Sequence, residues 1–248
     1  MVGKIEFEIC VDSVESAVAA QDGGADRVEL CDNLFEGGTT PSYGSIEIAR
    51  RLLHIKLHVI IRPRGGDFLY SDVEFEVMKR DIESAKELGV DGFVIGILKA
   101  DGSIDTERTT ELVRIARPMS VTFHRAFDVC GDPFAALEDL VTIGVDRVLT
   151  SGQKPNGVEG SELIGKLVEK ADGRISILAC GSLDESNIAD VIKKTGVSET
   201  HFTAFEEIAS KMEFRNDAVA MGSDDAGSEY VRRVTTAARV RSSIDSAK

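Results

Sequence analysis

The chain has 248 residues and a formal net charge of −14. Phosphate backbones are bound by clustered Lys and Arg, so this acidic balance excludes nucleic acid as an expected partner. No apolar run reaches about 18 residues and the first residues have the pattern of a strand, which predicts a soluble protein without a membrane span or a signal peptide.

The four cysteines, Cys10, Cys31, Cys130 and Cys180, are far apart in the sequence and form no C-x-x-C pair. This spacing is not that of a disulfide framework and favours reduced thiols in the cytoplasm. A chain of this length can bury enough surface to fold without a metal or disulfide, so a bound metal would serve function.

Strand-like and helix-like segments alternate along the chain. The strands are expected at 4–11, 26–31, 56–62, 91–98, 119–125, 146–150, 174–180 and 199–204, and the helices at 13–22, 42–53, 72–88, 105–117, 132–143, 159–172, 184–194 and 226–242. Eight such units predict an α/β protein, a (β/α)8 TIM barrel with a single domain over 1–248. Residues 206–248 are expected to form an extended loop plus the last helix, and 206–227 to cover the barrel mouth as a lid. The alternative is an open doubly wound sheet.

A weak internal repeat supports the count of strands. Gly-Ala-Asp or Gly-Val-Asp occurs at Gly24, Gly89 and Gly144, and a related Gly-Val-Ser at Gly196. Each motif precedes an even-numbered strand. Glycine ends the preceding helix because it adopts a left-handed conformation without a Cβ clash.

Alternation along the strands predicts which side chains face the barrel interior. Apolar residues of one phase should pack outward against helices. The polar phase, expected inside, contains Glu6, Glu8, Cys10, Arg27, Glu29, Cys31, His58, Arg62, Thr122 and His124. Buried charges require partners, so Glu6 and Arg27 are expected to pair, while the residues nearer the carboxyl ends form the candidate site.

Cys10 and Cys31 end neighbouring strands, so their thiols could face each other. A soft thiolate pair favours Cu(I), with Zn²⁺ as the next candidate. The alternative is that two small buried residues pack where larger ones would not fit.

Arg62 and Arg64 flank Pro63 at the end of the third strand and precede two glycines. Two guanidiniums there suit bidentate capture of a small anion, and Thr150 and Ser151 after the sixth strand could assist through hydrogen bonds. The alternative is that both arginines form salt bridges with interior acids.

Acid–base chemistry is a further possibility for the strand ends. His124 and Asp128 lie four residues apart after the fifth strand, and His201 on the eighth strand could join them. Glu8 and Glu29 are the other candidate catalytic groups, although a lone histidine at a strand end is often structural.

Several motifs together resemble the copper homeostasis protein CutC family. They are Val28-Glu29-Leu30-Cys31, Gly37-Gly38-Thr39-Thr40-Pro41-Ser42, the run from Ile61 to Ser71, Phe123-His124-Arg125-Ala126-Phe127-Asp128 and Arg147-Val148-Leu149-Thr150-Ser151-Gly152. The resemblance implies a cytoplasmic TIM barrel that forms a homo-oligomer, a dimer or tetramer, and binds Cu(I), with Cys10 and Cys31 at the family's proposed copper ligands. The stretch from Cys180 to Leu183 departs from the family, whose members usually carry a proline and several glycines there.

Three functions follow as hypotheses. The first is Cu(I) binding in copper homeostasis through Cys10 and Cys31. The second is an enzyme that holds a small anionic substrate with Arg62 and Arg64 and moves a proton with Glu8 or His124. The third is a scaffold protein whose barrel catalyses nothing, which fold alone does not exclude.

Overall fold

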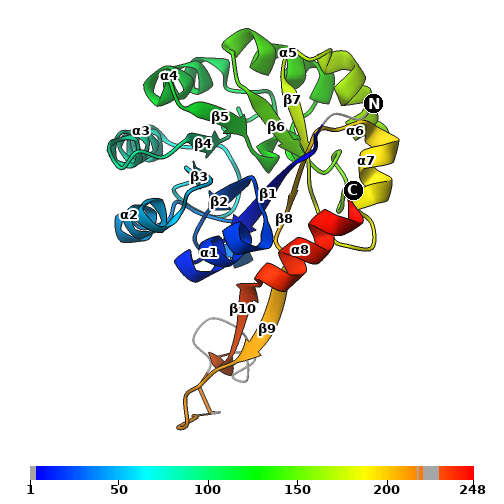
Figure 1. Cartoon of the computed structure of the whole chain (residues 1–248). Helices are drawn as coiled ribbons and strands as arrows, with labels where there is room; N and C mark the ends of the chain where they lie inside the picture. Colours follow the sequence, from blue (N-terminus) through cyan, green and yellow to red (C-terminus); the bar gives the residue numbers. More distant parts are fainter. Residues whose placement is uncertain (1–3, 217, 220–228) are drawn as a thin grey trace.

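The computed structural model describes residues 4–216, 218–219 and 229–248. Its central strands are β1 (Glu6–Val11), β2 (Arg27–Leu30), β3 (Lys56–Ile60), β4 (Gly92–Ile95), β5 (Ser120–Phe123), β6 (Arg147–Thr150), β7 (Ser176–Ala179) and β8 (Glu199–Phe202). Each strand pairs in parallel with the next, and β8 pairs with β1 (Figure 1). This closure confirms the predicted (β/α)8 barrel and excludes the open sheet, in which β1 and β8 would not meet.

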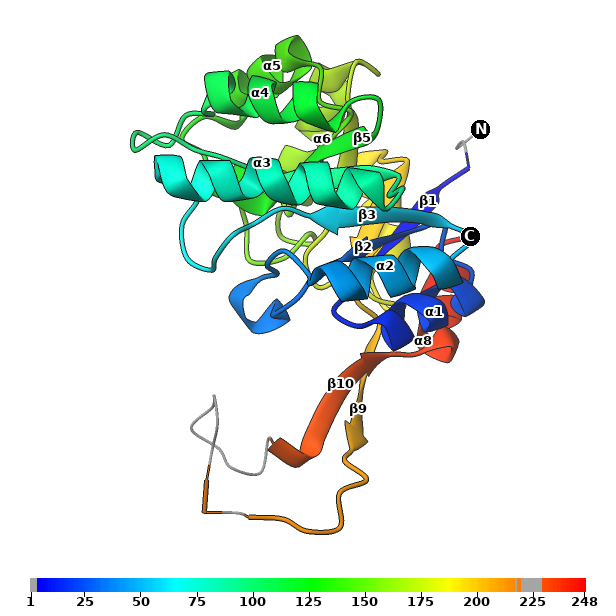
Figure 2. The ribbon, with the colours of Figure 1, turned by 90° about the vertical axis from the view of Figure 1, so that its left-hand side faces the viewer.

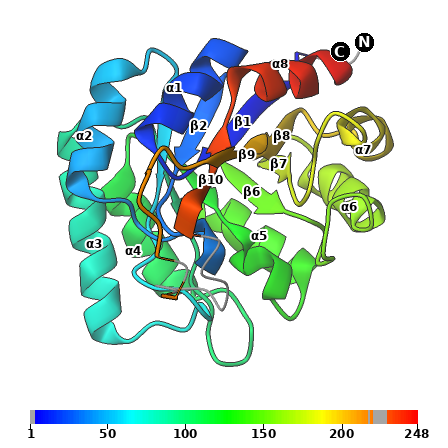
Figure 3. The same cartoon turned by 90° about the horizontal axis from the view of Figure 1, so that it is seen from below.

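The helices form a ring around the barrel (Figure 3). They are α1 (Val14–Gly23), α2 (Tyr43–Leu52), α3 (Asp72–Glu87), α4 (Thr106–Ala116), α5 (Pro133–Ile143), α6 (Ser161–Ala171), α7 (Ile188–Thr195) and α8 (Ala237–Ser246), with short 3-10 helices η1 (Leu34–Glu36) and η2 (Arg125–Val129). None of the described helices is long and apolar enough to cross a membrane.

The glycine repeat marks helix-to-strand turns, as predicted. Gly24 and Gly144 end α1 and α5 with φ of 101° and 83°, in the left-handed region that glycine adopts easily. The aspartate of the motif also has a structural role, which the sequence did not show: it joins neighbouring strands. Asp26 accepts a hydrogen bond from the backbone N–H of Phe7, and Asp146 accepts one from Val121, so each ties the start of one strand to the next.

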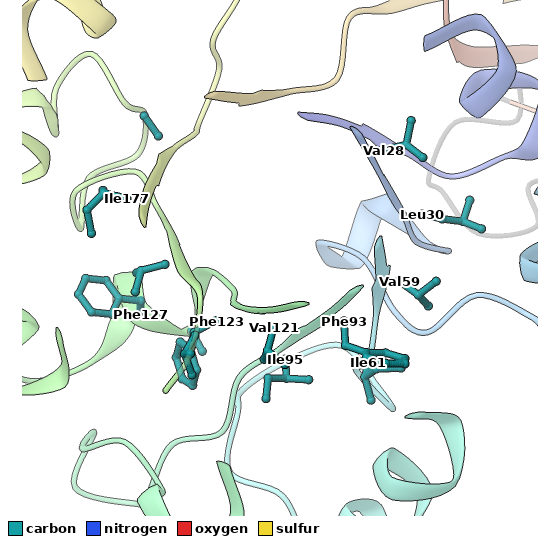
Figure 4. Packing of buried hydrophobic residues seen from close by; sticks show 14 of the residues in the cluster. Val28, Leu30, Val59, Ile61, Phe93, Ile95, Val121, Phe123, Phe127 and Ile177 are labelled. Carbon is teal, nitrogen blue, oxygen red and sulfur yellow. The ribbon is translucent and has the colours of Figure 1, made fainter. Parts of the chain in front are cut away.

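The hydrophobic core lies between the strands and the helices. Val28 and Leu30 of β2, and Val59 and Phe93 of β3 and β4, are fully buried on this outer face, and Figure 4 shows them pointing away from the barrel axis. The inner face holds a separate small cluster that includes Cys10 and Cys31. The predicted division into an outer apolar and an inner polar phase is therefore confirmed for β2, while the inner cluster also holds the apolar Ile60 of β3 and Val94 of β4.

A layer of paired charges fills the amino-terminal half of the interior. Arg27 is almost fully buried and donates to Glu8 through Nε, to Glu199 at 2.7 Å and to Glu6 at 3.3 Å. Arg147 adds a second cation 3.0 Å from Glu199. The predicted pairing of Glu6 with Arg27 is confirmed, but Glu8 and Glu199 are the more deeply buried partners.

The segment after β8 differs from its prediction. Residues expected in a loop and in the first half of a helix at 226–242 instead include two antiparallel strands, β9 (Phe205–Ala209) and β10 (Val231–Thr235), and α8 begins only at Ala237. Val231, Arg232 and Arg233 pair with β9, so the segment forms a strand where a helix was expected, through contacts that are not local in the sequence.

The described part of this segment also does not form the predicted lid. It stands out from the barrel as an arm (Figure 2), and Ile208, Met212 and Phe214 on it are exposed. Residues 217 and 220–227 of the expected lid lie outside the described residues.

Candidate functional site

Two thiols meet at the carboxyl ends of β1 and β2. Cys10 and Cys31 are free and buried, and their Sγ atoms are 3.6 Å apart. Cys31 also donates to the carbonyl of Val11 at 3.2 Å. The structure thus places the two cysteines in contact, as the strand pattern predicted, and the pair can act as two soft ligands for one metal ion.

The loop between β2 and α2 covers this thiol pair. It turns back on itself through backbone hydrogen bonds between Asp32 and Thr39, and Leu34 packs against the cysteine cluster. Gly38 (φ +90°) passes so close to Cys31 that an added Cβ would lie 3.3 Å from the Cys31 Cβ. A side chain at Gly38 would therefore press on the thiol pair.

Arg62 holds this loop in place. Its Nη1 donates to the carbonyls of Glu36 and Gly38 at 2.6 and 2.7 Å, and its Nη2 donates to the carbonyl of Gly66 at 2.9 Å. Arg62 therefore binds backbone carbonyls and does not form the salt bridges with interior acids that were expected as the alternative to anion binding. These contacts leave Nε as the one buried nitrogen of this guanidinium without a partner among the described residues.

Cys10 has a second set of neighbours, from β2 and β8. Glu29 stands beside Cys10 in the strand register, and His201 reaches the same place from β8. One ligand atom each from Cys10, Glu29 and His201 lies within 4.8 Å of the others, and all three residues are buried. Glu8 accepts from His201 Nδ1 at 2.7 Å, and His201 Nε2 lies 3.6 Å from Glu29.

The charges of this group are strongly coupled. Burial would raise the pKa of Glu8, but Arg27 and His201 outweigh it and hold this pKa well below its usual value. Burial would lower the pKa of His201, yet Cys10, Glu8 and Glu29 raise it well above the ordinary value. The hydrogen bond with Cys31, together with burial, raises the pKa of Cys10. Without a bound cation, Cys10 is therefore a thiol.

Arg64 serves the loop after β3. Its guanidinium bonds Glu74 at 2.6 Å and Asp67 at 3.0 Å, and it also donates to backbone carbonyls of that loop. Arg64 therefore forms salt bridges, which were the expected alternative to anion binding. Its partners are acids of the loop and of α3, and not acids of the barrel interior. An anion at Arg64 would have to compete with two carboxylates.

Asp128 occupies the donors expected to bind an anion after β6. It accepts from the Thr150 hydroxyl at 2.5 Å, from the Ser151 hydroxyl at 2.9 Å and from the backbone N–H groups of Ser151 and Gln153. Arg125 closes the group with a bond to Asp128 at 2.8 Å. Asp128 thus stabilises the loop after β6. The hydroxyls of Thr150 and Ser151 already donate to its carboxylate, so an external anion would have to compete with Asp128 for them.

His124 is buried between Phe68 and Gly96. The ring centroids of His124 and Phe68 are 5.0 Å apart, and a Cβ on Gly96 would collide with the imidazole. Burial and the nearby Arg62 lower the pKa of His124 to about 3. Its Nδ1 accepts from the N–H of Ala126, so Nε2 carries the proton of the neutral ring and has no partner among the described residues.

His201 is the site residue whose place the sequence did not predict. The sequence pattern suggests a place beside His124, but His201 contacts Glu8 and approaches Glu29 instead. Glu8 and His201 are 193 positions apart, and only the closure of β8 onto β1 brings them together. The alternation of β8 carried a signal, because Glu199 and His201 share the inward phase.

The fold and the site define the class of protein: a TIM barrel with a buried thiol pair and an ion-pair network at its axis. Residues 5–206 match the CutC family, and the chain belongs to that family. A CutC family protein of Bacteroides fragilis is 53% identical over 241 residues, which cover 97% of this chain and 96% of the relative. The copper homeostasis protein cutC homolog of Homo sapiens is 52% identical over 235 residues, covering 95% of this chain and 86% of the human protein.

Solved structures agree with the assignment. A CutC protein from Streptococcus agalactiae superposes with a TM-score of 0.76 at 40% identity, over 80% of this chain and 98% of that chain. Phosphoribosylanthranilate isomerase from Thermotoga maritima, at 12% identity and a TM-score of 0.57, shares the barrel fold alone.

Proposed function

We propose that this protein takes part in copper homeostasis by binding Cu(I) between Cys10 and Cys31. The observation that carries the proposal is the 3.6 Å separation of the two buried Sγ atoms at the carboxyl ends of β1 and β2. Two thiolates are ligands that soft Cu(I) prefers, and catalytic and binding residues of TIM barrels gather at this end of the strands.

The neighbouring charges favour a cation at the thiols. Glu29 is buried beside Cys10 and favours a cation over an anion at this place, while Glu8 is already paired with Arg27. The proposal includes a cytoplasmic location, where the thiols stay reduced, and a homo-oligomer, a dimer or tetramer, as expected for this family.

Titration of the reduced, metal-free protein with Cu(I), under anaerobic conditions and against a competing chelator, tests this function. We expect one Cu(I) per chain, and loss of that binding in the Cys10→Ala, Cys31→Ala double variant, because both soft ligands are removed. Cys130→Ala is the matched control, since Cys130 is also a buried free thiol but lies in the β5–α5 connection.

Equal Cu(I) affinity in the wild type and the double variant would contradict the proposal and make the pair a packing feature. Sedimentation of the same preparation measures the oligomeric state, and a monomer with and without copper would contradict that part of it.

A second candidate function is catalysis on a small anionic substrate. It is favoured by three buried polar atoms that have no hydrogen-bond partner among the described residues: Arg62 Nε, Tyr70 Oη and His124 Nε2. The side chains of Arg62 and His124 both lie against Phe68. All three of these buried atoms are hydrogen-bond donors, which is the chemistry that a carboxylate or phosphate requires. In this version of the function His124 donates a hydrogen bond, and Arg64 takes no part.

Thermal unfolding with inorganic phosphate and a panel of small carboxylates tests the second candidate. A ligand at 100 times its Kd is expected to raise the Tm by about 5 °C or more. His124→Gln should abolish the shift, whereas His54→Gln, at an exposed histidine, should retain it. A panel in which no anion raises the Tm would remove this candidate.

A further inference from the structure

Cys10 belongs to two groups of potential ligands, the second of which does not include Cys31. From this second group, to which β1, β2 and β8 each contribute one residue, we infer that Cys10, Glu29 and His201 form a Zn²⁺ site that is distinct in its ligands from the proposed copper pair. The three ligand atoms lie within 4.8 Å of one another. Around a tetrahedral zinc ion, ligands at about 2.0–2.3 Å from the metal are separated by about 3.3–3.8 Å, so only small side-chain rotations are required.

Glu29 provides the first independent observation. The residue is buried, and its Oε1 has no hydrogen-bond partner among the described residues. Its Oε2 approaches His201 Nε2 only to 3.6 Å, beyond hydrogen-bonding distance. A buried carboxylate oxygen without a partner costs free energy, and a cation shared with Cys10 and His201 would satisfy it.

The orientation of His201 provides the second observation. A carboxylate oxygen only accepts hydrogen bonds, so the 2.7 Å contact makes His201 Nδ1 the donor to Glu8. Nε2 is then the nitrogen that can bind a metal, in exchange for its proton, and it is the atom that faces Glu29. Carboxylate–histidine–metal arrangements of this kind fix the ring and its tautomer at zinc sites. Glu8 is itself held by Arg27.

Charge decides which ion suits these ligands. The Cys10 thiolate and the Glu29 carboxylate carry two negative charges, which a divalent ion neutralises and Cu(I) would leave half compensated. Thiolate, imidazole and carboxylate are all established zinc ligands, and three of them leave a fourth position for water or a small ligand. Cys31, whose thiol donates to Val11, lies outside this set.

The experiment separates the two sites because they share only Cys10. Reduced, metal-free full-length protein is titrated with Co²⁺, whose thiolate-to-metal charge-transfer absorption reports a bound cysteine, and the Co²⁺ is then displaced with Zn²⁺. We expect the absorption in the wild type and in Cys31→Ser. Glu29→Gln and His201→Gln should weaken Zn²⁺ binding by at least about tenfold. His58→Gln is the matched control, because His58 is also a buried interior histidine but lies outside the set.

The Cu(I) titration is repeated on the same variants. Retention of Cu(I) binding in Glu29→Gln, together with its loss in Cys31→Ser, would establish two ligand sets. A wild-type protein without the charge-transfer absorption would overturn the zinc site whatever the variants do, and would leave the copper proposal standing. Unchanged Zn²⁺ affinity in folded Glu29→Gln and His201→Gln, checked by circular dichroism, would also overturn it.

Discussion

Replacing Arg27 by methionine is expected to lower the free energy of unfolding by about 3–5 kcal/mol, the usual cost of leaving a buried charge without its partner. Arg27 is the shared cation for Glu6, Glu8 and Glu199, and the last two of these carboxylates are buried. Methionine keeps much of the volume of the side chain but none of its five donors. Urea unfolding of the wild type and the variant measures the difference.

Arg80→Met is the matched control. Arg80 pairs with Glu83 on the surface of α3 and its side chain is 78% exposed, so the change should cost less than about 1 kcal/mol. Adding Glu8→Gln to Arg27→Met should recover part of the loss, because it removes the stranded charge. A loss below about 1 kcal/mol in Arg27→Met would show that the interior carboxylates do not depend on this cation.

Acidification from pH 6.5 to 5 is expected to destabilise the protein by about 2 kcal/mol for each of two buried histidines. Burial lowers the pKa of His58 to about 3, and burial and Arg62 lower that of His124 to about 3, from an ordinary value of 6.5. Below pH 6.5 the unfolded chain takes up protons at both rings while the folded chain does not. The free energy of unfolding therefore decreases as the pH is lowered from 6.5 to 5.

His201 does not offset this fall. Its pKa is raised in the folded protein, so the stability that it contributes is complete below pH 6.5 and is lost only as the pH rises. Urea unfolding at pH 7, 6 and 5 tests the expectation. His124→Gln should remove about half of the pH dependence, and His54→Gln should leave it intact. Equal stability at pH 5 and 7 would contradict a neutral, buried pair of histidines.

Much of the barrel could be predicted because its signals are local. Alternation of period two assigned Val28 and Leu30 to the outer face and Glu29 and Cys31 to the inner face, and the structure confirms both. Gly24 and Gly144 marked the helix ends because their backbone conformations are ones that other residues seldom adopt. The contact of Cys10 with Cys31 followed as well, because consecutive parallel strands are neighbours.

The uses of the polar side chains were less predictable. Arg62 and Thr150 have the residue types of an anion site, yet one holds the loop over the thiols and the other donates to Asp128. Donors bind internal carbonyls and carboxylates as readily as external anions, and residue type does not distinguish the two. The two strands of the arm were not predicted either, because β10 is a strand only through its pairing with β9 and its own residues carry no clear strand pattern.

By itself, the sequence determined the eight βα units, the inward and outward faces of β2 and the proximity of the two thiols, because these depend on backbone periodicity and on neighbouring strands. Only the tertiary structure decided that His201 and Glu8 meet, and that Glu29 and Cys10 share their neighbourhood with that histidine. Barrel closure joins the last strand to the first, and no local pattern encodes the contacts that form across that seam.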